Sequence, residues 1–523
     1  MTALVEPLFA RSTRGRISSS PLLADVNGDG WPEIFVGGDR LHGLSWDGVP
    51  MPRWPRRGRL PFASSPAFGD IQGDGRGEVV VGCDDGGIYA FHADGDPVAG
   101  WPQATDADVF STPALADLDG DGASEIVVGS DDGCVRALRG DGSTMWTAPI
   151  PGRPFVSASP TVAAFDGDGR PGVAVGAWDR GLHAWAADGT GHRRIGAAGH
   201  VVWSSAASVN LEDRGGHLVW AADRVHVTSA GPRVASQWPR ATDSWIVSSP
   251  AVAELRSGEG PSIVVGSERL YTWDVRGRLR SGWPVDVGDF VWSSPIAFDL
   301  DGDGAREVLV GSWDGGIHAL RPDGRPVPGF PLRTGGPIFS TPAAAPLPRG
   351  GGLLVAASWD GSIRGWTLPR ARFRPGDWAQ FRGSADRRGA QPERFAGIEP
   401  DAAPEPEASG GFALEGARIE DWNGLRRVVL SGSNLEAARR LELVYEIAGE
   451  GRRHPVPFVN SRGRFVALVQ PLRIPRILRF HVEAEGAGEP PVRWPSTGAV
   501  RTWTGGGRLR GVLPRPRTAM DPA

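Results

Sequence analysis

The chain has 523 residues, a formal net charge of −5 at pH 7, 75 glycines, 46 prolines and two cysteines. Its length allows two or three domains. No run of 18 apolar residues occurs, so no membrane-spanning helix is expected, and the slightly acidic balance does not favour a nucleic-acid partner. The glycine and proline content is typical of an all-β chain with frequent turns.

A repeated unit fills most of the chain, and residues 294–331 show it most clearly. Each unit opens with Ser-Pro or Thr-Pro, continues through a loop into a β-rich run, and turns twice at Asp-Gly before a Trp-Pro or Phe-Pro. The gaps between successive openings are 45, 47, 47, 46, 44, 45 and 47 residues. Eight such units, each with several short strands, predict an eight-bladed β-propeller. The openings are Pro21, Pro66, Pro113, Pro160, Ala206, Pro250, Pro295 and Pro342.

Strands can be placed within the unit from its apolar positions. The first is expected across the opening, the second at runs such as 125–129, the third after an Asp-Gly hairpin turn, and the fourth across Gly-Trp-Pro. The eighth unit stops after its third strand, at Trp366, and the residues before Pro21 resemble an isolated fourth strand. We therefore expect the N-terminus to close the ring. The residue four before each opening is apolar and predicted to be buried: Ile17, Phe62, Val109, Val156, Val202, Ile246, Val291 and Ile338.

Beyond the repeats the composition changes. The propeller is predicted over residues 1–390, a disordered linker rich in Pro, Glu, Ala and Gly over 391–411, and a disordered Gly-, Arg- and Pro-rich tail over 505–523. Short β-like runs at 427–431, 440–447, 464–469 and 477–483 indicate a small β-sandwich-like domain over 412–504.

Four units carry an acidic loop between the first two strands, with oxygen-bearing side chains at positions 1, 3, 5 and 9 and glycine at positions 4 and 6. This donor set suits Ca²⁺, which takes six to eight oxygen ligands, and the glycines let the loop curl around an ion. The alternative is a set of metal-free Asx-turns. We predict up to four structural Ca²⁺ ions. The residues are Asp25, Asn27, Asp29 and Glu33; Asp70, Gln72, Asp74 and Glu78; Asp117, Asp119, Asp121 and Glu125; and Asp299, Asp301, Asp303 and Glu307.

These repeats resemble the FG-GAP or VCBS-type repeat of the integrin α-subunit head and of many bacterial propeller proteins. The resemblance covers residues 10–390 and implies calcium in the four intact loops, although position 9 is Glu where integrins have Asp. Residues 378–389 resemble a Trp-x-x-Phe-Arg segment that accompanies such repeats in bacteria. The family identifies a scaffold, so function has to be read from the site.

An aromatic set is expected on the face opposite the acidic loops, with Phe110 and Phe339 beside it. Tryptophan faces with neighbouring carboxylates suit a carbohydrate or protein ligand, but tryptophan also fills the space between blades, and the pattern leaves both readings open. The candidate ligand-binding residues, which lie at the turns between second and third strands or at the junctions before an opening, are Trp178, Trp203, Trp245, Trp292, Trp313 and Trp359.

One position of the third strand carries a large polar residue in every unit, and we interpret it as structural. No catalytic triad stands out, so a non-enzymatic binding module is favoured over a polysaccharide lyase-like enzyme, and a quinoprotein dehydrogenase ranks lower. Calcium loops favour an extracytoplasmic location, while residues 1–16 show no apolar signal segment. The third-strand residues are His42, Tyr89, Arg136, His183, His226, Tyr271, His318 and Arg364.

Overall fold

The computed structural model describes residues 3–165, 169–211, 215–229 and 238–395, together with strands between 413 and 503. All regular elements in these ranges are β-strands, and a helix capable of crossing a membrane is not found among them. The chain divides into two compact units, Met1–Ala403 and Pro404–Ala523.

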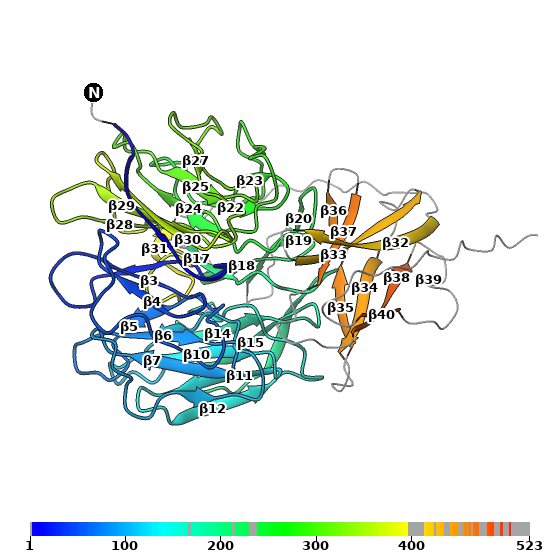
Figure 1. Ribbon diagram of the computed structural model, residues 1–523, viewed down its shortest axis with the longest axis horizontal. Coiled ribbons are helices and arrows are strands. Elements are labelled where there is room, and N and C mark those ends of the chain that lie inside the picture. The colour runs from blue at the N-terminus through cyan, green and yellow to red at the C-terminus, as the bar shows by residue number, and fades with distance from the viewer. Residues whose placement is uncertain are drawn as a thin grey trace, which may run out of the picture. The chain divides into compact units, whose positions relative to one another are not determined.

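The first unit is a propeller of eight blades, numbered after the sequence repeats, which follow one another in chain order around it (Figure 1). Blades 1 and 6 have three named strands, and their outer position is reduced to isolated bridges such as Leu41↔Arg56 and Leu270↔Val285. Blades 1 to 4 consist of β2 (Leu22–Ala24), β3 (Glu33–Val36) and β4 (His42–Leu44); β5 (Ala67–Gly69), β6 (Glu78–Gly82), β7 (Gly87–Phe91) and β8 (Gln103–Ala104); β9 (Ala114–Ala116), β10 (Glu125–Ser130), β11 (Cys134–Leu138) and β12 (Thr144–Pro149); and β13 (Thr161–Ala163), β14 (Gly172–Gly176), β15 (Gly181–Ala186) and β16 (Arg193–Ala197). Blades 5 to 8 consist of β17 (Ala207–Leu211), β18 (Gly215–Ala221), β19 (Arg224–Ser229) and β20 (Arg240–Ala241); β21 (Ala251–Ala253), β22 (Ser262–Gly266) and β23 (Leu270–Asp274); β24 (Ile296–Phe298), β25 (Glu307–Gly311), β26 (Gly316–Leu320) and β27 (Leu332–Arg333); and β28 (Ala343–Pro346), β29 (Gly352–Ala357) and β30 (Ser362–Leu368).

The N-terminal strand closes the ring as predicted. β1 (Glu6–Ser12) pairs antiparallel with β30, from Glu6↔Thr367 to Ser12↔Ser362, and so supplies the outer strand of blade 8. Because the last blade contains both ends of the repeat array, opening the ring requires breaking this pairing.

The core lies between neighbouring blades. One apolar cluster joins Ala67 and Ile88 of blade 2 to Leu115 and Ile126 of blade 3, and the other clusters join adjacent blades in the same way. All eight residues four positions before an opening are at most 1% exposed, which confirms the predicted burial. Cys83 and Cys134 are buried, free thiols.

A belt of hydroxyl groups links all eight blades. In each unit the residue before the opening position donates its backbone N–H to the hydroxyl oxygen of the equivalent residue in the next unit, and Thr341 of blade 8 returns to Ser20 of blade 1 at 3.0 Å. Because the belt runs through all eight units and returns to the first, it links the two ends of the repeat array. The other donors and acceptors run from Ser20 to Ser65, Thr112, Ser159, Ser205, Ser249, Ser294 and Thr341 in that order.

The Trp-Pro pairs lie just outside the fourth strand rather than within it. Trp101 and cis-Pro102 directly precede β8, and the Trp101 indole N–H donates to the carbonyl oxygen of Gly140 in the next blade at 2.8 Å. Trp238 and Trp283 make the same contact with Val275 and Pro322. These rings therefore connect neighbouring blades, as expected.

The segment after the last blade circles the inside of the propeller, and we call residues 371–389 the strap. The first strand of each blade lies innermost, and its second residue would otherwise leave an unpaired N–H on the central channel. In seven of the eight blades, a described hydrogen bond joins this N–H group to the strap, in order around the ring. Donor and acceptor pairs are Ala297 with Trp378, Ala344 with Ala379, Leu23 with the Gln380 side chain, Phe68 with Ala385, Leu115 with Asp386, Val162 with Arg388, and Ser208 with Gly389.

Two buried arginines hold the strap in place. Arg387 donates to the carbonyl oxygens of Pro21, Pro66 and Phe381, at 2.6 to 3.1 Å. Arg382 likewise donates to backbone oxygens, including that of Ser159 at 2.9 Å. Burial lowers the pKa of each guanidinium to about 9.

The strap leads into β31 (Ala390–Phe395), which pairs parallel with β17 and includes residues 391–395 of the predicted linker. Residues 396–411 and the tail 505–523 lie outside the described residues. In the second unit, strands form at the four predicted runs, and their antiparallel pairing forms two sheets; a β-sandwich remains a prediction. These strands are β32 (Ala413–Trp422), β33 (Leu425–Ser433), β34 (Arg440–Ile447), β35 (Arg453–Pro457), β36 (Val459–Ser461), β37 (Arg464–Val469), β38 (Leu478–Glu485), β39 (Val492–Trp494) and β40 (Arg501–Trp503).

Candidate functional site: acidic loops and an aromatic face

The four acidic loops have one geometry. In the loop of blade 3, Asp117 at position 1 accepts the N–H of Gly120 at 2.6 Å and that of Gly122 at 3.1 Å. Both glycines have positive φ, 85° and 94°, a conformation that a side chain would strain. The equivalent bonds recur in blades 1, 2 and 7, made by Asp25, Asp70 and Asp299.

The glutamate at position 9 begins the second strand and reaches back into its own loop. Glu125 and Glu307 accept the N–H of Leu118 and Leu300 at 2.7 and 2.9 Å. Glu33 and Glu78 accept those of Val26 and Ile71. Burial, together with the nearby aspartates, raises the pKa of all four carboxyl groups, to about 7 for Glu33 and Glu307.

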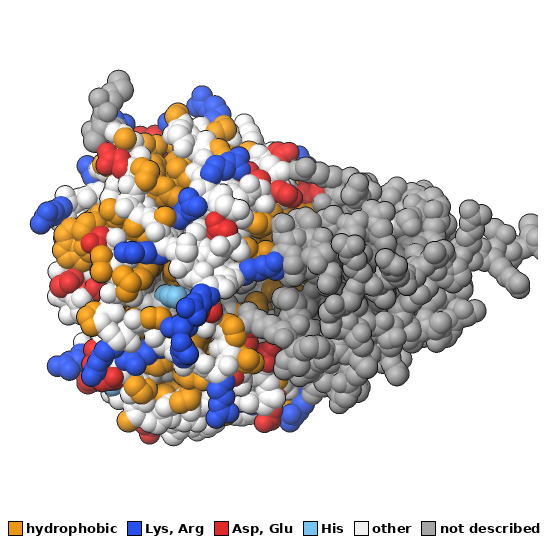
Figure 2. Space-filling model, in the orientation of Figure 1, with side chains coloured by type: hydrophobic (Ala, Val, Ile, Leu, Met, Phe, Trp, Pro, Cys, Tyr) orange, Lys and Arg blue, Asp and Glu red, His pale blue; other side chains and the backbone are white. Residues whose placement is uncertain are grey.

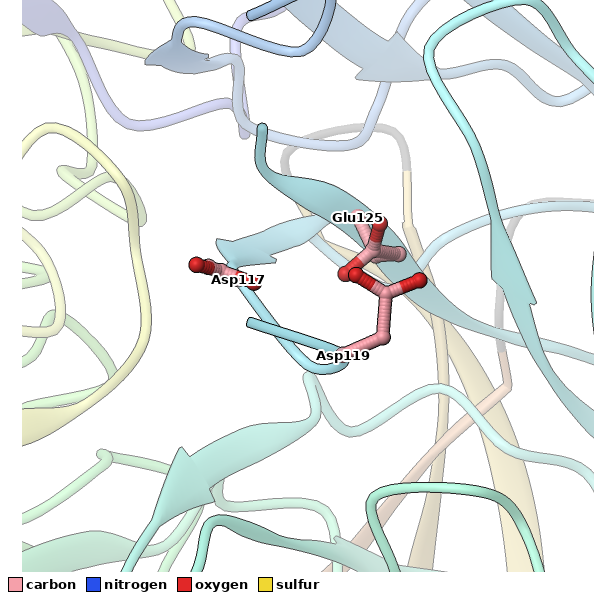
Figure 3. Close-up of side chains that lie close together, drawn as sticks. All are labelled: Asp117, Asp119 and Glu125. Atoms are coloured by element: carbon pink, nitrogen blue, oxygen red, sulfur yellow. The ribbon is translucent and has the colours of Figure 1, made fainter. Parts of the chain in front are cut away.

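Two of the loops bring three carboxylate oxygens within 4.8 Å of one another, among the residues described. They are Asp117, Asp119 and Glu125 in blade 3 (Figure 3), and Asp299, Asp301 and Asp303 in blade 7. The Oε1 atom of Glu307 is buried and has no hydrogen-bond partner in the described part of the chain. A converging, all-oxygen donor set with an unsatisfied carboxylate oxygen fits a hard divalent cation such as Ca²⁺.

The loops of blades 1 and 2 fit less well. Asn27 turns its amide N–H toward Glu33 Oε1 at 2.7 Å, and Gln72 brings no charge. Neither loop brings three acidic oxygens together among the described residues. Aspartates therefore close the loop by hydrogen bonds in all four blades. Among the described residues, only the loops of blades 3 and 7 also bring three acidic side chains together in a way that suits an ion.

On the opposite face, aromatic side chains meet around the end of the channel. The ring centroids of Phe110 in blade 3 and Trp203 in blade 5 are 6.4 Å apart. Contacts continue from Trp203 to Trp245 at 6.3 Å, to Trp292 at 6.0 Å, and to Phe339 at 4.6 Å. We call these five residues the aromatic basin.

The structure divides the six predicted tryptophans into two groups. Trp203 and Trp292 are half-buried, so part of each ring faces solvent. Trp178, Trp245, Trp313 and Trp359 are 6 to 9% exposed. The first three contact Trp203 or Trp292, and Trp359 contacts Trp313 and Phe339. The indole nitrogens of Trp178 and Trp245 are buried without a hydrogen-bond partner among the described residues.

The carboxylates expected beside these tryptophans are paired with third-strand side chains of their own blades. Asp179 pairs with His183 and Asp314 with His318, each at 3.1 Å, and Asp360 lies 3.9 Å from Arg364. Similar contacts hold His42, Tyr89, Arg136 and His226 to the turn that precedes them. The large polar position of the third strand is thus structural, as interpreted from the sequence.

A carboxylate that sequence reasoning did not single out as a site residue lies at the equivalent turn of blade 3. Asp131 accepts a hydrogen bond from Ser157 at 2.9 Å. Burial and the neighbouring Asp108 and Asp84 raise its pKa to about 7. The repeat alignment places Asp131 where blade 4 has Trp178, so acidic and aromatic groups share this face.

Other residues missed at the sequence level are Phe155 and Phe290, which pack edge-on against Trp178 and Trp313. They occupy the position of Trp245 in their units, which the repeat alignment could have indicated. On the face shown in Figure 2, basic, acidic and apolar side chains are interspersed over the first unit. This view shows no continuous basic surface of the kind that binds nucleic acid.

Comparisons with known proteins agree with the repeat. A family model described as FG-GAP-like repeat matches residues 117–175, in blades 3 and 4. Curated protein sequences give no match.

Several solved structures match this chain, two of them with a TM-score above 0.5. A europium-containing methanol dehydrogenase matches with a TM-score of 0.52 and 11% identity over 70% of this chain and 93% of that chain. Saccharomyces cerevisiae Sqt1 matches with a TM-score of 0.51 and 12% identity, covering 70% and 100%. BamB from Moraxella catarrhalis has a TM-score of 0.48 and 15% identity, covering 69% and 99%. Likeness at these identities concerns the fold alone.

Proposed function

We propose that this chain, which carries an FG-GAP-like repeat in a β-propeller fold, is a non-enzymatic, calcium-braced binding module. Its ligand is a protein or a carbohydrate that contacts the aromatic basin. The observation that supports this most directly is the convergence of Phe110, Trp203, Trp245, Trp292 and Phe339 from five blades on one face. Packing between neighbouring blades alone would not bring Phe110 of blade 3 to Trp203 of blade 5, since these two blades are not adjacent in the ring.

Calcium has a bracing role in this proposal. The residues Asp117, Asp119 and Glu125, and Asp299, Asp301 and Asp303, would hold the ion. The chemistry it supplies is charge neutralisation among crowded carboxylates at the hairpin between the first two strands. The loops lie at the face opposite the basin, so calcium acts on the blades rather than on the ligand.

The lyase-like alternative needs a free cationic side chain at a uronate. Arg136 and His183, the type of third-strand residue considered for that role, are held by Asp132 and Asp179 at 3.1 Å. Engaged side chains of this kind favour a binding module. An assay for unsaturated uronate products from polyuronates separates the two functions.

The test is a glycan array and a peptide array probed with the full chain, followed by titration of the best probe against variants. Replacing Trp203 or Trp292 with alanine should weaken binding several-fold, because a ring contact contributes about 0.5–1.5 kcal/mol beyond area burial. Trp46→Ala is the matched control, since Trp46 is also half-buried but stacks on Trp31 beside the loop of blade 1. Equal affinities in all three variants would place the ligand elsewhere.

A further inference from the structure

The acidic loop of blade 7 differs from the other three in having two arginines against its carboxylates. Arg374 Nη2 lies 3.1 Å from Asp299 Oδ2, and Arg321 Nη2 lies 3.2 Å from Asp301 Oδ2. In blade 3 the corresponding distance, from Arg139 to Asp119, is 3.6 Å. Among the described ion pairs, none joins an arginine to the loop aspartates of blades 1 and 2.

Arg374 belongs to the strap, just before it enters the channel. Arg374 also donates to the carbonyl oxygen of Gly304 in the loop at 3.3 Å, and the N–H of Arg372 donates to that of Asp299 at 2.8 Å. Four residues after Arg374, Trp378 makes the first of the strap's contacts around the channel. One stretch of chain therefore contacts both the acidic loop and the innermost strands.

The same carboxylates form the cluster that fits a cation. Oxygens of Asp299, Asp301 and Asp303 lie within 4.8 Å of one another, and the buried Glu307 Oε1 has no hydrogen-bond partner among the described residues. An arginine beside this cluster supplies positive charge that an incoming ion would otherwise supply. The Arg374 side chain is 47% exposed, so it can leave Asp299 and remain solvated.

We propose that Arg374 is a tethered cation that competes with Ca²⁺ for the acidic loop of blade 7, so that calcium binding there loosens strap residues 372–377. This rests on the calcium binding proposed above. Coupling between two equilibria is reciprocal: if the docked arginine lowers the affinity of the loop for calcium, then calcium lowers the stability of the docked strap by the same factor. Blade 7 would then be the weaker site of the two best-formed loops, despite its full Asp-x-Asp-Gly-Asp motif.

The test is calorimetric titration of the full chain with CaCl₂, using Asp301→Asn to assign the dissociation constant that belongs to blade 7. Arg374→Gln should tighten that constant about three- to fivefold, which is what the loss of a partly exposed ion pair corresponds to. Arg374→Lys should stay near the original value. Arg370→Gln is the matched control, because Arg370 is an exposed arginine four residues earlier in the chain.

Hydrogen exchange of the peptide covering residues 372–377 gives a second readout. Calcium should speed exchange there in the original chain and have no further effect in Arg374→Gln. Calcium binding with an unchanged blade 7 constant in Arg374→Gln, or slower exchange of the strap with calcium, overturns the competition alone. Absence of calcium binding in every protein overturns the calcium proposal together with this one.

Discussion

Glu307 gives the sharpest test of how the acidic loops work without an ion. Its side chain is 0% exposed, one carboxylate oxygen accepts the N–H of Leu300 at 2.9 Å, and the other has no partner among the described residues. Burial, with Asp301, Asp303 and Asp299 nearby, raises its pKa from 4.5 to about 7. Folding therefore forces this carboxyl group toward its neutral form at neutral pH.

The effect on stability follows from proton linkage. Below about pH 4.5 the group is protonated in both the folded and the unfolded chain, so its titration does not change the free energy of unfolding. Between about pH 4.5 and 7 the unfolded chain loses its proton first, so the free energy of unfolding falls as pH rises. Moving a pKa from 4.5 to about 7 corresponds to about 3 kcal/mol, all of which is lost above pH 7.

Glu307→Gln removes the ionisable group and keeps an oxygen for the Leu300 N–H. In urea unfolding with a chelator, the variant should match the original chain at pH 4 and exceed it at pH 8, by at most about 3 kcal/mol. With calcium the advantage of the variant at pH 8 should shrink, because an ion held by the neighbouring aspartates favours the charged form of Glu307. Glu6→Gln, at an exposed position of β1, is the matched control for the loss of one carboxyl group. A variant that is less stable than the original chain at both pH values, without calcium, would refute the reasoning.

Three further changes have defined outcomes. Asp119→Ala should reduce the bound calcium measured by atomic emission and shrink the rise in melting temperature that calcium causes. Ser65→Ala removes the acceptor for the Ser20 N–H and should cost about 1–3 kcal/mol in urea unfolding, with Ser65→Thr restoring most of it; no loss would mean that the hydroxyl belt is dispensable. Arg387→Met leaves three buried carbonyl groups without their donor and should cost about 3 kcal/mol or more, whereas an unchanged unfolding midpoint would show that the strap adds little to stability.

The fold could be predicted because each blade repeats the same physical requirements. An apolar residue four before the opening and a hydroxyl before it recur at fixed spacing, and the structure uses each of them in the same way eight times. An Asp-Gly turn recurs in most units. The ring closure could be predicted by counting strands, because the eighth unit lacked a fourth strand and the N-terminal residues formed a strand that belonged to no other unit. The strap could not be found this way, because it occurs once and has no period.

The repeats nevertheless indicated that some segment such as the strap was needed. Eight innermost strands place eight N–H groups at equivalent positions on the channel, and such groups need acceptors when water is excluded. A sequence can indicate that acceptors are required without showing which segment supplies them. The pairing of Leu23 with the Gln380 side chain, among backbone acceptors elsewhere, shows how irregular the solution is.

The exposure of individual rings on the aromatic face also could not be predicted from the sequence. Trp292 and Trp313 lie in one blade with rings 4.5 Å apart, yet Trp292 is half-buried and Trp313 is 6% exposed. The difference depends on which ring covers the other, and a repeat pattern does not give the exposure of either ring. The sequence could therefore indicate the aromatic face but not which rings reach its surface.

The loops that have lost the acidic motif show what part of the fold holds together without that motif. In blade 6, Glu254 accepts the N–H groups of Gly258 and Gly260 at 2.9 and 3.2 Å, so one carboxylate closes that loop without the motif. Arg306, beside the loop of blade 7, also donates to the carbonyl oxygen of Glu254 at 2.7 Å and ties the two loops together. Since ring closure rests on β1, the hydroxyl belt and the strap, which do not involve an ion, a cation would act on the local repulsion among crowded carboxylates. Removing calcium should therefore loosen individual hairpins before it opens the ring, and hydrogen exchange should rise in the acidic loops while the pairing of β1 with β30 stays protected.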